Sequence, residues 1–244
     1  AGRDGLAIRC DVSNSNDVRG VVSEVMGKFG KVDILVNNAG KGPGAVPPER
    51  LGVAHITEEE WDRLVAINLK GAFLFSREVV PHMKQRRYGK IINVSSIGWI
   101  LPPVPTPHYH AAKAGIVGLT RDMASELAPF NINVNAILPG PIRTPFYAES
   151  LRGKSEAEVE AFFEQLGKVT PLQRVGRPED IAGVALFLAS ELSSYVTGAS
   201  IPVAGGLPLQ PYRMDVPTYR AHLHLARPFG PRYRASLAAL LADP

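Results

Sequence analysis

The sequence predicts an α/β fold with a doubly wound parallel sheet, covered by helices on both faces. Two observations carry this prediction. Short apolar segments alternate with longer segments whose apolar residues recur at helical spacing, which is the order expected for a parallel sheet. The chain has 244 residues, of which 45% are hydrophobic and 20% charged, so it suits one α/β domain with a sizeable core.

Five apolar segments have the length and the flanking residues of strands. They contain large aliphatic side chains, and turn-forming residues lie at or near their ends. These segments are residues 6–10, 34–36, 91–94, 132–138 and 200–203. In a parallel sheet their carboxyl ends meet at one edge, where the ligands of doubly wound sheets bind.

Helical segments lie between these strands, and their ends carry recognisable caps. Asn14 precedes the first helix, and Gly30 is placed to end it. Thr57 opens the second helix with a capping box, and Pro178 takes a favoured first-turn position in the last one. The helices after the first are expected to cover about residues 61–83, 109–128 and 178–188, with a further helical stretch within residues 141–177.

Charge and hydropathy argue against two classes of partner. The formal net charge is +4, and five arginines against two aspartates place +3 of it in residues 211–244. A nearly neutral domain of residues 1–210 gives no case for nucleic-acid binding, and the basic extension is too sparse to form a binding patch. No apolar run is long enough to cross a bilayer, and the first residues lack the apolar core of a signal peptide. We therefore expect a cytoplasmic protein without membrane or nucleic-acid partners.

Cysteine and histidine contribute little to the predicted chemistry. Cys10 is the only cysteine, which excludes an internal disulfide and a cysteine-rich metal site, and its apolar surroundings predict a buried, inert thiol. The six histidines show no metal-binding spacing, and His222 and His224 stand alone. We expect no metal site.

Tyr109 and Lys113 give the strongest chemical signal. They lie four residues apart on an expected helix, so their side chains share a face. An ammonium group beside a phenol favours the phenolate and lowers the pKa of the tyrosine, which makes it usable for proton transfer near neutral pH. Such a pair alone is common on helix surfaces and needs support from its neighbours.

Three further polar features supply that support. Ser96 ends an expected strand 13 residues before Tyr109, and residues 37–40 end another strand at the same edge. Asn68 falls on the apolar stripe of its helix, where a polar side chain needs a buried partner. By itself, Asn68 is better explained as a side chain that hydrogen-bonds nearby backbone.

Together these residues resemble the short-chain dehydrogenase/reductase family, especially its 3-oxoacyl carrier-protein reductase-like members. The resemblance covers about residues 6–206, with the motifs in the family order, and implies a Rossmann-like fold. Its motifs are Asp11-Val12, Asn37-Asn38-Ala39-Gly40, Asn68-Leu69-Lys70-Gly71, Ser96, Tyr109-x-x-x-Lys113, Pro139-Gly140-Pro141-Ile142-Arg143-Thr144, Gly176-Arg177-Pro178-Glu179-Asp180 and Gly205-Gly206.

The resemblance implies an oxidoreductase that uses NAD or NADP to interconvert a secondary alcohol and a ketone by hydride transfer. Tyr109 would exchange a proton with the substrate oxygen, and Ser96 would hydrogen-bond that oxygen. Lys113 would hold the nicotinamide ribose, with Tyr109 beside it, and lower the pKa of Tyr109. Asn68 would position a water that links Lys113 to solvent. These four side chains are the expected catalytic group.

The same resemblance assigns the remaining contacts. Asp11 and Val12 would touch the adenine end of the cofactor. The backbone and carboxamide contacts would be Asn38, Ala39, Gly40, Pro139, Gly140, Ile142 and Thr144. A homodimer or homotetramer is expected to form through the helices at residues 61–83 and 109–128, and the substrate is expected to be a small-molecule alcohol or ketone.

The chain departs from the family pattern at its start. No glycine-rich turn that opens a helix precedes residue 6, so the sheet is expected to lack the family's first two strands and helices. Three outcomes are then open: the strand at residues 6–10 shifts beside residues 34–36, another segment fills the gap left by the two missing strands, or residues 6–10 are poorly ordered. NAD or NADP would bind this chain weakly. The alternative function is a non-catalytic scaffold or fragment, and the choice between NAD and NADP stays open.

Two segments match no motif of the family. The proline-rich loop from Ser96 to Tyr109 carries Trp99 and Leu101, and it is either a rigid apolar wall for the substrate or a loop without a role. Residues 211–244 are either an added oligomer contact or read-through sequence.

Overall fold

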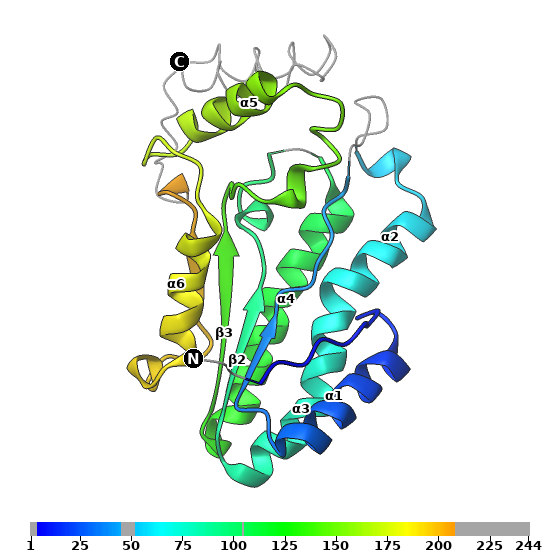
Figure 1. Cartoon of the computed structure of the whole chain (residues 1–244), viewed down its shortest axis with the longest axis vertical. Helices are drawn as coiled ribbons and strands as arrows, with labels where there is room; N and C mark the ends of the chain where they lie inside the picture. The colour runs from blue at the N-terminus through cyan, green and yellow to red at the C-terminus, as the bar shows by residue number, and fades with distance from the viewer. Residues whose placement is uncertain (1–3, 45–51, 104, 208–244) are drawn as a thin grey trace.

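The computed structural model describes residues 4–44, 52–103 and 105–207. The extension at residues 211–244, with His222 and His224, lies outside them. The described residues form one parallel sheet in the order β1-β2-β3-β4. Its strands are β1 (Ile34–Asn37), β2 (Gly89–Val94), β3 (Ile132–Pro139) and β4 (Ser200–Val203). Because all four are parallel, their carboxyl ends meet at one edge (Figure 1), as the sequence predicts.

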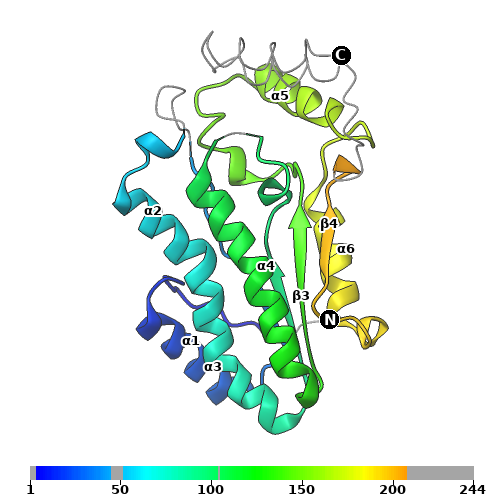
Figure 2. The same ribbon diagram turned by 180° about the vertical axis from the view of Figure 1, so that it is seen from behind.

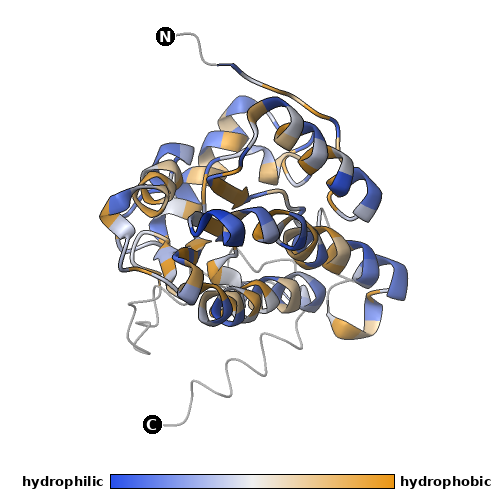
Figure 3. Cartoon of the chain, turned by 90° about the horizontal axis from the view of Figure 1, so that it is seen from below, coloured by the Kyte–Doolittle hydropathy of each residue, from blue (hydrophilic) through white to orange (hydrophobic). Residues whose placement is uncertain are grey.

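Helices cover both faces of this sheet (Figure 1 and Figure 2). One face carries α3 (Gly71–Arg86) and α4 (Pro107–Leu127), with α1 (Ser15–Phe29) beside α3, and the other carries α6 (Pro178–Ala189). Ile91 belongs to the core under the first group, whereas its neighbour Ile92 packs with Leu188 of α6. Figure 3 shows the strands coloured as hydrophobic between these helices. The predicted doubly wound α/β fold is confirmed.

The predicted caps fix the helix ends. The Asn14 side chain accepts hydrogen bonds from two backbone N–H groups in the first turn of α1, and Gly30 ends that helix with a φ of 71°. Thr57 forms the expected capping box at the start of α2 (Glu58–Val65). Pro178 is the first residue of α6.

The long helix expected over residues 61–83 is interrupted at its centre. A π-helical turn, η3 (Ala66–Lys70), separates α2 from α3. The N–H of Gly71 donates to the carbonyl of Ala66, five residues back, which is the bond that defines this wider turn. Asn68 lies in the turn and is buried.

The chain after β3 crosses the carboxyl edge of the sheet. Gly140 packs so closely on the residue after β4 that an added Cβ would lie 2.7 Å from the Cα of Ala204. Next come η6 (Pro145–Tyr147) and α5 (Glu156–Lys168), and α5 lies beyond the tips of the strand arrows in Figure 1. The other short helices are η2 (Val53–His55), η4 (Ile97–Trp99), η5 (Ala128–Phe130) and η7 (Glu191–Ser193). In the part of the chain that the structure describes, the helices are too short or too polar to span a bilayer.

Residues 6–10 do not form a strand, so that prediction is wrong. Among the described residues this segment pairs with no strand, and Leu6 is 37% exposed. The Lys28 ammonium donates to the carbonyl of Gly5 at 3.1 Å and ties the segment to α1. An extended apolar segment becomes a strand only where a neighbouring strand can satisfy its backbone groups. Among the described residues, β1 pairs with β2 and does not pair with residues 6–10.

Candidate active site

The carboxyl edge of the sheet gathers the four expected catalytic side chains. Ser96 follows β2, and Tyr109 and Lys113 lie in the first two turns of α4. Asn68 reaches the same edge from η3, and Gly40 lies just after β1. Segments far apart in the sequence therefore meet where doubly wound sheets bind their ligands.

Lys113 is 5% exposed and is fixed against the end of β2. Its Nζ donates to the carbonyl of Val94 at 2.9 Å, and the Ser95 hydroxyl donates to the Lys113 carbonyl at 2.6 Å. Burial lowers the pKa of the amine to about 8. The amine is thus held in place and close to its titration point near neutral pH.

Tyr109 lies beside Lys113, but its pKa follows its burial. Burial raises the pKa of the phenol above its ordinary value, and a hydrogen bond with Ser96 partly opposes the rise. The Lys113 Nζ lies 5.9 Å from the centre of the Tyr109 ring and is bonded to Val94 instead. The predicted lowering of this pKa by Lys113 is therefore wrong for this structure. A phenol in this state is protonated at neutral pH and can donate its proton.

Asn68 is 2% exposed and joins two distant segments. Its Nδ2 donates to the carbonyl of Lys41 at 2.8 Å, and its Oδ1 accepts from the N–H of Lys41 at 3.2 Å. Nδ2 also donates to the carbonyl of Leu64 at 3.1 Å, one turn earlier in its own helix. The simpler explanation, a bond to nearby backbone, accounts for Leu64 alone, because Lys41 lies 27 residues away. Positioning of a water stays a prediction.

Gly40 lies against the side chains of Asn68 and Lys113. A Cβ at this position would lie 2.8 Å from the Asn68 Oδ1 and 3.4 Å from the Lys113 Nζ. Glycine is the residue that lets the backbone approach them this closely. Asn38 and Ala39, just before it, are exposed.

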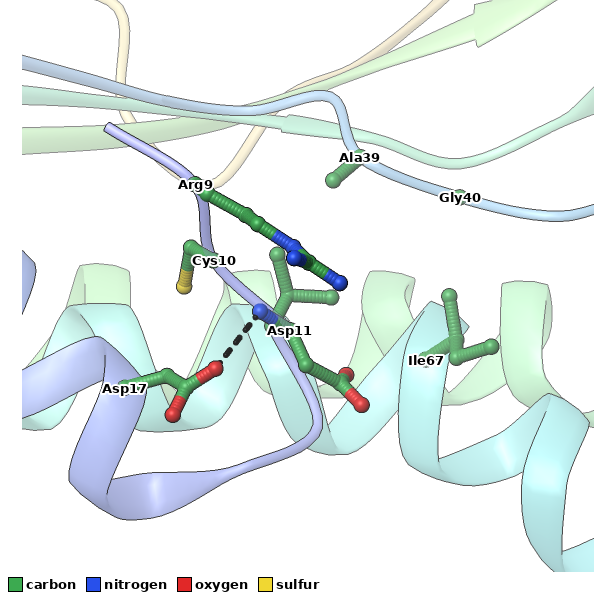
Figure 4. Close-up of a pocket in the computed structure, with 8 residues that line it drawn as sticks. Arg9, Cys10, Asp11, Asp17, Ala39, Gly40 and Ile67 are labelled. Carbon is green, nitrogen blue, oxygen red and sulfur yellow. Dashed lines mark hydrogen bonds between the residues drawn. The ribbon is translucent and has the colours of Figure 1, made fainter. Parts of the chain in front are cut away.

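An open pocket of about 680 Å³ lies between the N-terminal segment and the loop after β1. Figure 4 shows the Arg9 side chain extending across this pocket. Its lining residues are Arg9, Cys10, Asp11, Val12, Asp17, Ala39, Gly40 and Ile67. Four of these, Asp11, Val12, Ala39 and Gly40, are expected cofactor contacts.

Asp11 and Val12 are held in place by neighbouring groups. The Asp11 carboxylate accepts from the N–H of Ser13 at 2.9 Å and from its hydroxyl at 2.6 Å, and these bonds hold the pKa of Asp11 below its ordinary value. Val12 packs on the start of α3, where a Cβ on Gly71 would lie 3.0 Å from its Cγ2. The carboxylate therefore faces the pocket in its charged form.

Cys10 lies on the rim of the same pocket. It is half-buried, so the prediction of a buried thiol is only partly right. Burial, with Asp17 and Asp11 nearby, raises the pKa of the thiol. The thiol form is unreactive, in agreement with the expected inert cysteine.

The remaining cofactor candidates follow one another from the end of β3. They are Pro139, Gly140, Ile142 and Thr144. Ile142 is buried and pairs with Gly176 in an isolated parallel bridge. The Thr144 hydroxyl caps η6 by accepting from the N–H of Phe146 at 3.4 Å. The Ile142–Gly176 bridge and the Thr144 cap fix this segment at the carboxyl edge of the sheet. Its contacts with the carboxamide of a nicotinamide stay a prediction.

An aromatic pair beside Tyr109 was missed by the sequence reasoning. The Phe146 ring lies 6.1 Å from the Tyr109 ring, centre to centre, and Tyr147 adjoins Phe146 at 5.3 Å. Both residues belong to η6. Adjacent aromatic residues in a short loop helix have no periodic pattern, so the available signal was their position shortly after the motif that ends at Thr144.

Comparison with known proteins gives concordant matches. The family described as "Enoyl-(Acyl carrier protein) reductase" matches residues 1–208. The chain is 42% identical over 197 residues to the 3-oxoacyl-(acyl-carrier-protein) reductase FabG of Thermotoga maritima, covering 81% of this chain and 74% of that protein. It is 39% identical over 202 residues to the (2S)-[(R)-hydroxy(phenyl)methyl]succinyl-CoA dehydrogenase subunit BbsD of Thauera aromatica, covering 82% and 75%.

Solved structures agree with the sequence matches. Levodione reductase superimposes with a TM-score of 0.75 at 35% identity, covering 83% of this chain and 76% of that one. The aldohexose dehydrogenase of Thermoplasma acidophilum superimposes with a TM-score of 0.79 at 29% identity, covering 87% and 83%. Both names are those of oxidoreductases.

Proposed function

Because the chain belongs to the short-chain dehydrogenase/reductase family, we propose that it interconverts a secondary alcohol and a ketone with NAD or NADP. The observation that carries this proposal is the pairing of Tyr109 with Ser96 at the end of β2, with the Lys113 amine beside them. The family itself supports the coarser statement that the protein is an NAD(P)-dependent oxidoreductase.

Ser96 and Tyr109 have separate tasks in ketone reduction. When bound, a reduced nicotinamide would supply the hydride that the carbonyl carbon receives. The Ser96 hydroxyl donates a hydrogen bond to the carbonyl oxygen as negative charge develops there. The protonated phenol of Tyr109 then transfers its proton to that oxygen, which completes the alcohol. Oxidation of an alcohol reverses these steps, with the tyrosine oxygen as the proton acceptor.

The described residues fit the two ends of the cofactor. The Gly40 backbone lies close to Asn68 and Lys113, and a Cβ at this position would occupy the space beside them. Lys113 would hold the ribose hydroxyls, and the pocket beside Asp11 would take the adenine end. These contacts serve the two ends of a dinucleotide.

The alternative function is a non-catalytic scaffold, and the observation that favours it concerns the part of the pocket where a pyrophosphate would lie. Among its described lining residues, no glycine-rich helix start offers backbone N–H groups to a pyrophosphate. A scaffold of this kind is expected to bind NADH and NADPH weakly. A fluorescence titration of the purified chain measures this, and tight binding of either cofactor would argue against the scaffold.

Replacement of Tyr109 by phenylalanine tests the catalytic assignment. Tyr109→Phe removes only the hydroxyl, so hydride transfer to a ketone should fall by on the order of 10²–10⁴-fold while cofactor affinity stays nearly constant. Tyr195→Phe is the matched control, because Tyr195 is fully exposed. Near-normal turnover by Tyr109→Phe would remove the tyrosine from the mechanism.

We also propose that the protein assembles as a homodimer or homotetramer through α2, α3 and α4. Trp61 and Phe73 are 40% and 43% exposed on α2 and α3, so both rings offer apolar surface to a second copy of the chain. A twofold contact between copies would bury them. Light scattering at micromolar concentration should give a multiple of the chain mass, and Phe73→Lys should shift it towards the monomer. A strictly monomeric wild-type chain would contradict the proposal.

A further inference from the structure

We propose that Phe146 and Tyr147 form an aromatic substrate platform that selects uncharged ketones and alcohols with a planar, apolar group next to the reacting carbon. This inference rests on the proposed function, since it places the substrate at Tyr109. It names a class of substrate that the family alone does not specify.

The first support is the position of Phe146. Its ring lies 6.1 Å from the ring of Tyr109, at an angle of 53°, and the residue is 50% exposed. A Cβ on Gly42 would lie 2.7 Å from the Phe146 ring, so the ring rests directly on the loop after β1. A large apolar ring that is backed by backbone and half open beside the reactive phenol offers a contact surface to a bound substrate.

The second support is the rigidity of the platform. Tyr147 meets Phe146 edge to face at 5.3 Å, and it contacts Phe162 and Phe163 of α5 at 5.5 Å and 5.6 Å. Edge-to-face packing of this kind gives each ring a defined orientation. The platform is therefore fixed to α5 instead of moving freely with the loop.

The third support is the charge around this cluster, where the cation that the described residues place against the rings is already paired. The Arg143 guanidinium lies over the Phe163 ring at 4.8 Å, and it is already paired with the Glu160 carboxylate. The Glu149 carboxylate lies against Gly44, two residues after the glycine that Phe146 contacts. A substrate carboxylate on the Phe146 ring would lie against an apolar surface, so an uncharged group is favoured there.

The Tyr147 hydroxyl adds a polar group to the apolar surface. Burial, with Tyr109 close by, raises the pKa of Tyr147 to about 12, so the phenol keeps its proton. The residue therefore stays neutral in any ordinary buffer. A neutral aromatic surface suits a flat, unsaturated substituent, because ring pairs gain from stacked and edge-to-face contacts.

Two methyl ketones of matched size test the platform. Phenyl methyl ketone is planar, whereas cyclohexyl methyl ketone has a puckered, saturated ring. Dissociation constants are measured for the full chain by ligand-observed NMR titration. We expect the phenyl ketone to bind roughly 2- to 12-fold more tightly, which is the range that an aromatic pair contributes.

Two variants assign the preference to Phe146. Phe146→Leu keeps an apolar side chain of similar reach and should lose the preference while still binding the cyclohexyl ketone. Phe29→Leu is the control, because Phe29 is 40% exposed at the end of α1 and should leave the preference unchanged. Circular dichroism verifies that each variant is folded. Equal binding of the two ketones by the wild type, no binding of either, or a preference that survives in Phe146→Leu would overturn the platform.

The outcome separates this inference from the proposed function. Binding needs no hydride transfer, so a phenyl preference without turnover under any nicotinamide cofactor would remove the oxidoreductase function and keep the platform. Turnover that depends on Tyr109, without a phenyl preference, would remove the platform and keep the function.

Discussion

Asn68 pairs through its side-chain amide with both backbone polar groups of Lys41, at 2.8 Å to the carbonyl and 3.2 Å from the N–H. This reciprocal pair imitates one step of a sheet ladder, although one partner is a side chain. It fixes the loop after β1 at the point where Gly40 meets Lys113. The position of the candidate cofactor surface therefore depends on a side chain in the middle of a helix.

Replacement of Asn68 by alanine should release that loop. The Lys41 N–H and carbonyl would lose their partner, and each lost hydrogen bond should lower the free energy of unfolding by about 0.5–1.5 kcal/mol. Hydrogen exchange of the Lys41 amide should accelerate strongly, which a merely local packing defect would not cause. Urea denaturation and exchange measured by NMR supply the two values. Unchanged protection of the Lys41 amide in Asn68→Ala would contradict the assignment.

A methyl group at Gly40 should disturb the same site. Gly40→Ala places a Cβ 2.8 Å from the Asn68 Oδ1, so the loop or the amide must move, and we expect destabilisation by about 1–3 kcal/mol. Gly20→Ala is the matched control, because nothing lies within 4 Å of its added Cβ in the interior of α1. The control should stabilise the protein by roughly 0.5–1 kcal/mol. Thermal denaturation of both variants gives the comparison, and equal effects would be incompatible with the close approach at Gly40.

A buried asparagine links the edge strand to α4. Asn93 is fully buried, its Oδ1 accepts from the Asn37 Nδ2 at 2.8 Å, and its Nδ2 donates to the Thr120 hydroxyl at 2.9 Å. Hydrogen bonds in a dry interior couple the groups they join. The end of β1 is thereby held to the helix that carries Tyr109.

A double-mutant cycle measures this link. Asn93→Ala and Thr120→Val should each destabilise the protein, and the double variant should lose less than their sum, with a coupling energy of about 0.5–3 kcal/mol. Urea denaturation of the four proteins gives the value. Strictly additive losses would show that the two side chains act independently.

The buried amine of Lys113 should make stability depend on pH. Burial lowers its pKa from 10.5 to about 8, so between these values the unfolded chain binds more protons than the folded one. The free energy of unfolding should therefore rise as pH increases from 8 to 10. The difference from Lys113→Met, which lacks the titrating group, should grow by on the order of 2 kcal/mol.

Urea denaturation of the wild type and Lys113→Met at pH 8, 9 and 10 tests this. Above pH 10 the raised pKa of Tyr109 acts with the opposite sign, since the folded state then binds the extra proton. A difference between the two proteins that stays constant from pH 8 to pH 10 would mean that the amine does not titrate in this range.

Local signals predicted most of the fold. The caps at Asn14, Gly30 and Thr57 lie where the sequence places them, because each depends on residues within a few positions. The segment at residues 6–10 was predicted wrongly because a strand depends on a distant partner. Its apolar composition is the same whether or not another strand lies beside it.

The sequence predicted which residues would lie in the site, but it did not predict all the contacts between them. Tyr109 and Ser96 are brought together as expected, whereas the link between Asn68 and Lys41 spans 27 residues and has no sequence signature. The pKa of Tyr109 was predicted in the wrong direction, because sequence spacing gives proximity to Lys113 but not the depth of burial. Phe146 was missed because its importance comes from a contact across the fold.

The π-helical turn at Ala66–Lys70 makes the number of residues between α2 and α3 important for the site. Leu64, Asn68 and Ala72 are all buried at four-residue steps, and each such step exceeds one α-helical turn by roughly 40°. The wider turn absorbs that excess. Deletion of one residue from the turn would restore an unbroken α-helix and keep Leu64 and Ala72 on one face, because seven residues span nearly two full turns, but it would remove the wider turn that carries Asn68. Loss of one residue from this turn should therefore disturb the pairing of Asn68 with Lys41, while the helix on either side keeps its packing.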